Sequence, residues 1–150
     1  MIDIPVSNKI LHELNLKEDG TIIFPSDFNH LGTADAVKMA LSRYAKAGLI
    51  KRLAHGIYLK PKKDPEIGAL TPSLDEIAKA IARRDNARII PTGIMAMHLL
   101  GLTTQIPMKA VYLTDGSPRI IHIGNRTIKF KSTSFLIKFN LKMKLIADRV

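Results

Sequence analysis

Cysteine and tryptophan are absent from this 150-residue sequence, and its aromatic residues are only three tyrosines and five phenylalanines. The lack of cysteine excludes disulfides and thiolate chemistry and favours a reducing compartment. No two histidines have the HxH or HxxxH spacing of paired metal ligands, so we predict no bound metal. Because no glycine-rich phosphate loop and no acid–base constellation is visible either, we expect no cofactor and no enzymatic activity.

Long apolar runs are also missing. The longest one, Ile89–Leu102, is too short to span a membrane and is interrupted by Pro91. The N-terminus lacks the basic start and apolar core of a signal peptide. Since 46% of the residues are nevertheless apolar, we expect a folded cytoplasmic protein with no membrane partner.

Acidic residues are scarce, with 13 against 23 lysines and arginines, which gives a formal net charge of +10. Eight of the basic residues lie between Lys38 and Lys63, where there is no aspartate or glutamate. Spread evenly, such a charge would indicate only a solvated basic surface. Its clustering favours a polyanionic partner, either nucleic acid or an anionic membrane surface.

The basic stretch begins with a predicted helix, Thr33–Ala47. Thr33 suits the N-cap, Asp35 suits the positive end of the helix dipole, and Gly48 suits the left-handed C-terminal cap. The residues predicted to face the core recur at helical spacing and are Ala34, Val37, Leu41 and Tyr44.

Two short runs after this helix, Leu49–Ala54 and Ile57–Lys60, predict a hairpin around the turn His55-Gly56. Before the helix we expect a first helix capped by Ser7, a strand over Thr21–Phe24 and a brief helix opened by Pro25. The order helix, strand, helix, helix, strand, strand is that of a winged helix-turn-helix.

Three prolines and several charges between Lys60 and Pro72 indicate a boundary. We therefore predict a winged-helix domain over residues 1–63, a linker over 64–72 and a small α+β domain over 73–150. The fold class is α+β. For the second domain we expect helices over Ser73–Arg84, where Ser73 and Glu76 form a capping box, and over Thr92–Leu100.

Its strands are predicted at Ala87–Ile90 and Ala110–Thr114 and in a hairpin, Arg119–Lys131, around Gly124-Asn125. Pairing across that turn places Ile121, Ile123, Ile128 and Phe130 on one face and His122, Thr127, Lys129 and Lys131 on the other. His98 falls on an apolar helix, where a hydrogen-bonded core histidine is the simpler interpretation. The segment from Phe135 onwards fits either a strand or a helix begun at Asn140.

A basic helix followed by a basic hairpin is typical of DNA-binding winged helices, in which the helix enters the major groove and the hairpin lies on phosphates. Lys38, Ser42, Arg43 and Lys46 should face outward, and Arg43 could contact a guanine through two hydrogen bonds. The complete set of predicted DNA-contacting residues is Thr33, Lys38, Ser42, Arg43, Lys46, Lys51, Arg52, His55, Lys60, Lys62 and Lys63.

The segment ALSRYAKAGLIKRLAHGIYLKPK resembles the winged-helix segment of AbiEi-like antitoxins, which are transcriptional regulators of type IV toxin–antitoxin systems. The shared pattern is VxxALxRLxKxGxIxRLxxGxY, in which Tyr44 replaces the usual leucine. The matching residues are Val37, Ala40, Leu41, Arg43, Lys46, Gly48, Ile50, Arg52, Leu53, Gly56 and Tyr58. The segments PTGIMAMHLLGLTTQIP, AVYLTDG and IGNRTIKFK look like the second domain of that family.

The resemblance implies a repressor of its own operon that binds repeats in its promoter as double-stranded DNA. It also implies a nucleotidyltransferase-like toxin that is opposed without a stable complex. Relatives usually continue further, so we expect this chain to be a shortened form. The alternative is an RNA-binding or protein-interaction module that uses the same basic surface. RNA readers usually expose aromatic side chains, which are few in this sequence.

Overall fold

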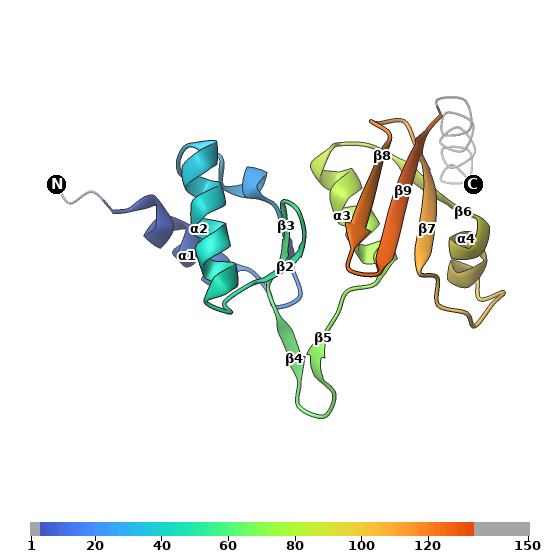
Figure 1. The fold of residues 1–150 in the computed structure, drawn as a ribbon, viewed down its shortest axis with the longest axis horizontal. Coiled ribbons are helices and arrows are strands. Elements are labelled where there is room, and N and C mark those ends of the chain that lie inside the picture. Colours follow the sequence, from blue (N-terminus) through green and yellow to red (C-terminus); the bar gives the residue numbers. More distant parts are fainter. Residues whose placement is uncertain (1–3, 134–150) are drawn as a thin grey trace, which may run out of the picture. The chain divides into compact units, whose positions relative to one another are not determined.

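The computed structural model describes residues 4–133 (Figure 1). The chain divides into two compact units, Met1–Pro72 and Ser73–Val150. Each unit combines helices with antiparallel strands, so the chain belongs to the α+β class. Within the described residues, none of the helices has the length and apolar character needed to cross a bilayer.

The first unit contains the predicted order of elements, although its second helix is a single 3-10 turn. The elements are α1 (Val6–Leu16), β1 (Ile22–Ile23), η1 (Pro25–Phe28), α2 (Ala34–Lys46), β2 (Lys51–Ala54) and β3 (Ile57–Leu59). The three strands form an antiparallel sheet in the order β1-β3-β2. The prediction that Ser7 caps α1 is wrong, because the helix begins at Val6, its N-cap residue is Pro5, and no side chain caps it.

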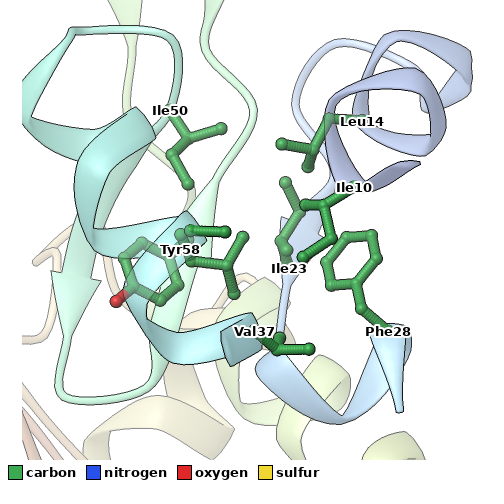
Figure 2. Packing of buried hydrophobic residues seen from close by; sticks show 9 residues of the cluster. Ile10, Leu14, Ile23, Phe28, Val37, Ile50 and Tyr58 are labelled. Carbon is green, nitrogen blue, oxygen red and sulfur yellow. The ribbon is translucent and has the colours of Figure 1, made fainter. Parts of the chain in front are cut away.

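The core of this unit lies between α1, α2 and the sheet, where the labelled side chains of Figure 2 point toward one another. Its fully buried members include Ile10 of α1, Ile23 of β1 and Leu41 of α2. Tyr44 is only half-buried, and its hydroxyl donates a hydrogen bond to the carbonyl oxygen of Ser7. The hydroxyl thus joins α2 to the first turn of α1, a contact that leucine at this position could not make.

The ends of α2 agree with the sequence prediction. The Thr33 hydroxyl oxygen accepts a hydrogen bond from the amide of Ala36 at 3.2 Å. At the other end Gly48 has a φ of +82°, the left-handed conformation that glycine adopts without steric cost. Gly32, just before the cap, is needed for a different reason, which is lack of space. A Cβ there would lie 2.9 Å from a methyl group of Val6.

The segment expected to be a linker contains a short hairpin formed by β4 (Lys62–Asp64) and β5 (Gly68–Leu70). The Asp64 carboxylate accepts hydrogen bonds from the amides of Glu66 and Ile67, at 2.8 and 3.1 Å. A side chain that satisfies two amides in this way organises the turn locally. The composition predicted a break in the chain but not this pairing.

In the described residues, up to 133, the second unit consists of a four-stranded sheet and two helices. Its elements are α3 (Leu74–Arg84), β6 (Ile89–Thr92), α4 (Gly93–Leu99), β7 (Lys109–Thr114), β8 (Arg119–Ile123) and β9 (Arg126–Ser132). The strand order is β6-β7-β9-β8, with β7 and β9 parallel and the other two pairs antiparallel. The capping box of Ser73 and Glu76 at the start of α3 is confirmed.

The hairpin of β8 and β9 has the predicted turn and faces. Ile121 pairs with Ile128, and Ile128 and Phe130 are buried, whereas His122 is exposed. The strand expected at Ala87–Ile90 lies two residues further along the chain, as β6. The segment for which both a strand and a helix were considered lies outside the described residues.

Candidate nucleic-acid interface

One face of α2 is exposed and basic. Because Val37, Ala40 and Leu41 are buried in the core, the opposite side of the helix faces solvent. That side carries the predicted contact residues Lys38, Ser42, Arg43 and Lys46, all of which are exposed. Within residues 4–133, none of the three cations on this face forms an ion pair with a carboxylate. These charges are therefore available to an external anion.

The face also carries Asp35, which is exposed in the first turn of α2. Its charge stabilises the positive end of the helix dipole. The same charge would repel a phosphate group, so this end of the helix suits a base edge better than the backbone of a nucleic acid. Thr33, next to it, is exposed, but its oxygen already caps the helix.

The hairpin of β2 and β3 supplies a second basic element in the same unit. Lys51, Arg52 and His55 are exposed on it. The Arg52 guanidinium is held locally, with Nη2 3.3 Å from Nδ1 of His55 and Nε donating to the Ala54 carbonyl at 3.4 Å. Gly56, the second turn residue, has a φ of +71°. The pairing is irregular between Arg52 and Ala54, which the sequence did not predict.

Lys60 is positioned differently from the other predicted contact residues. Its Nζ donates hydrogen bonds to the carbonyl oxygens of Asn15 and Lys17 and lies 3.8 Å from a carboxylate oxygen of Asp19. Carbonyls at the C-terminal end of a helix carry partial negative charge, which attracts an ammonium group. Lys60 thus holds the end of α1 to the sheet, and a phosphate contact would require it to leave these partners.

Lys62 and Lys63 are exposed, but they lie on β4 and not on the hairpin of β2 and β3. Asp64 and Glu66 lie close by in the same segment, so the charge of this hairpin is mixed. The predicted set therefore divides into a basic surface, a mixed hairpin and two residues with structural roles. We define the basic surface as Lys38, Ser42, Arg43, Lys46, Lys51, Arg52 and His55.

The aromatic side chains of the described chain are all buried or half-buried, including Phe24, Phe28 and Tyr58 in the first unit. Residues 4–133 thus present no exposed ring on which an unpaired base could stack. The same residues contain no group of three or more histidine, aspartate or glutamate side chains able to hold a metal ion.

The second unit contains a polar cluster that sequence reasoning missed. The Tyr112 hydroxyl is buried and donates a 2.7 Å hydrogen bond to Oδ1 of Asp75, whose Oδ2 lies 2.9 Å from Nζ of Lys79. Burial, together with the hydrogen bond to this carboxylate and its charge, raises the pKa of Tyr112 well above its usual range. Only the i, i+4 spacing of Asp75 and Lys79 was a signal in the sequence.

Comparison with known proteins identifies a family without a described function. A search of the curated proteins and a search of the solved structures each gave no match. A family model matches residues 9–146, a range that includes parts of both units. The chain therefore belongs to DUF6088, a family of unknown function.

Proposed function

We propose that the protein is a DNA-binding transcriptional regulator whose first unit acts as a winged helix-turn-helix. The observation that carries the proposal is the basic surface, which combines the outer face of α2 with the β2–β3 hairpin. Between Lys38 and Lys63 no acidic residue interrupts it. Clustered cations without carboxylate partners are the electrostatic feature expected of a surface that binds phosphates.

The order of elements supports a winged-helix mode of binding. The 3-10 turn η1, the turn ending at Gly32 and α2 correspond to a helix-turn-helix, with α2 as the recognition helix. In this mode α2 enters the major groove, where Arg43 donates two hydrogen bonds to a guanine. Lys51 and Arg52 on the β2–β3 hairpin contact backbone phosphates and contribute affinity that does not depend on sequence.

Double-stranded DNA fits this surface better than single-stranded RNA. Proteins that bind single strands usually stack bases on exposed aromatic rings. In the described part of the chain the rings are withdrawn into the cores, and the exposed contact groups are lysine, arginine, serine and histidine. Such groups suit phosphates and base edges in a duplex groove.

The resemblance to AbiEi-like antitoxins extends the proposal to a biological role. In this role the protein represses its own operon in the cytoplasm and opposes a nucleotidyltransferase-like toxin without forming a stable complex. The support is the residue pattern from Val37 to Tyr58. Co-expression with the product of the neighbouring gene tests the role: growth should be rescued although the two proteins do not co-purify. The proposed role is contradicted if growth is not rescued at any ratio of the two proteins.

Fluorescence anisotropy with the full chain tests DNA binding. The probes are a duplex from the region upstream of its own gene, a shuffled duplex of the same composition and a single-stranded RNA of equal length. We expect the upstream duplex to bind most tightly. If the five cations of the basic surface each engage a phosphate, log K should fall with log salt concentration with a slope of about −4.5. Equal or tighter binding of the RNA would favour the RNA-binding alternative, and a flat salt response would contradict both nucleic-acid models.

A further inference from the structure

Half of the large apolar side chains that are exposed in the described chain lie in one short segment of the second unit. Single exposed apolar residues are ordinary, but a cluster of them marks a surface that associates with another molecule. The segment from Ile89 to Met108 also contains no aspartate, glutamate, lysine or arginine, whereas 24% of the whole chain is charged. We call the seven exposed side chains the apolar surface: Ile94, Met97, Leu99, Leu100, Leu102, Ile106 and Met108.

One part of the apolar surface is the outer side of α4. This helix packs against β6 and β7 (Figure 1) and buries Met95. Ile94, Met97 and Leu100 recur every three residues on the side of the helix that faces away from Met95. The exposed side of α4 therefore presents a row of large aliphatic side chains to solvent.

The loop after α4 supplies the rest of the apolar surface. At the end of the helix the Leu102 amide donates a 2.8 Å hydrogen bond to the Met97 carbonyl, which turns the chain back. Further along the loop, Ile106 lines the same cavity as Leu99 of α4, so the loop returns beside the helix. Met108 follows two positions later, just before β7. The helix and the loop thus form one surface.

The size of the apolar surface fits a protein–protein interface. Its side chains are between 45% and 74% exposed. Since burial of one large aliphatic side chain removes roughly 60–120 Å² from water, the seven together present roughly 250–500 Å². A standard interface buries about 800 Å² on each partner, of which about 450–500 Å² is apolar. The apolar surface therefore supplies between half and all of the apolar area that a stable dimer needs.

The charge of the chain indicates which partner fits. With a net charge of +10, two copies repel each other wherever their cations meet. The apolar surface carries no charge of its own, and Lys109 and Arg126 lie only at its border, so two copies can meet there with little repulsion. A partner of opposite charge would gain more from the exposed lysines and arginines elsewhere on the chain. An uncharged surface on a basic protein therefore favours a second copy.

We propose that the protein forms a homodimer in which the apolar surfaces of two copies pack against each other. A two-fold axis brings the same surface of each copy together, and apolar side chains are complementary to their own kind. The proposal goes beyond DNA binding and does not depend on it. If DNA binding also holds, a dimer carries two copies of α2, and the operator should contain two half-sites.

The test is sedimentation equilibrium of the full chain without DNA, so that a failure of this proposal is distinguished from a failure of DNA binding. The salt concentration is about 500 mM, at which the Debye length of roughly 4 Å screens repulsion between the two copies. At a chain concentration of about 100 µM we expect twice the 16.6 kDa of a single chain. A monomeric parent chain under these conditions would overturn the proposal and assign the surface to a partner of a different kind.

Matched variants test where the dimer forms. Leu100→Asp places a charge in the apolar surface at a side chain 74% exposed, and it should weaken dimerisation about tenfold or more. Leu102→Asp, at a side chain 68% exposed, should act in the same way and decides the question if the first variant does not fold. The control is Ile67→Asp, which changes a side chain 76% exposed between β4 and β5 and should leave dimerisation unchanged.

Circular dichroism and thermal denaturation should show the parent fold in all three variants, because each substituted side chain is exposed. The location of the interface is refuted if the folded variants Leu100→Asp and Leu102→Asp dimerise as tightly as the parent chain. It is also refuted if Ile67→Asp weakens dimerisation as much as they do.

Discussion

Replacement of Arg43 by alanine separates sequence reading from phosphate contact. Arg43 is exposed on α2 and forms no ion pair with any residue between 4 and 133. Its removal should therefore change the free energy of unfolding by no more than about 0.5 kcal/mol. If Arg43 contacts a guanine through two hydrogen bonds, the loss should cost roughly 1–3 kcal/mol of specific binding, or about 5- to 150-fold in Kd. Non-specific binding should weaken far less.

Lys51→Ala is the matched control, because Lys51 is also exposed and basic but lies on the β2–β3 hairpin. It should weaken the upstream duplex and a shuffled duplex about equally and make the salt slope shallower by about one. The assay is fluorescence anisotropy on both duplexes between about 50 and 200 mM salt, with thermal denaturation of each variant alongside. If both variants lose affinity equally on both duplexes, α2 is only another phosphate contact. If neither loses affinity, the basic surface is not the DNA-binding surface.

Three further predictions concern stability and organisation. Leu41→Ala should destabilise the first unit by roughly 2–5 kcal/mol in urea denaturation, whereas Leu49→Ala, at a side chain 51% exposed, should stay within about 0.5 kcal/mol; equal effects would contradict the packing of α2. Burial raises the pKa of Tyr112, so its contribution to stability should be present below about pH 10 and lost as the pH rises further, a dependence that Tyr112→Phe should remove. Trypsin should cut first at Lys62 or Lys63 on the exposed β4 and leave two resistant fragments; first cleavage inside α2 or β9 would argue against two units.

Features specified by near neighbours were predictable from the sequence. The Thr33 cap of α2, the capping box of Ser73 and Glu76 and the turn at Gly124 each depend on residues within a few positions of one another. Hydrophobic periodicity added which side of α2 is buried, and hence that Lys38, Arg43 and Lys46 are exposed. It was wrong at Ala34, which was predicted to face the core but is exposed in the first turn. Apolar side chains that recur at the period of an element must share a face, whatever that face later packs against.

Features that join distant parts of the chain were decided by the tertiary structure. Charge alone grouped Lys60 with the DNA-contacting residues, but folding brings it to the carbonyls at the end of α1, more than forty positions earlier. β7 pairs in parallel with β9, although β8 lies between them in the sequence. No local sequence pattern predicts this pairing.

The prediction of a hydrogen-bonded core histidine at His98 is wrong for one atom, because the buried Nδ1 of this side chain has no hydrogen-bond partner among the described residues. Composition and periodicity determine which side chains are buried or exposed, because those depend on local spacing. Which groups meet, and which buried atom is left without a partner, depends on how the elements pack against one another.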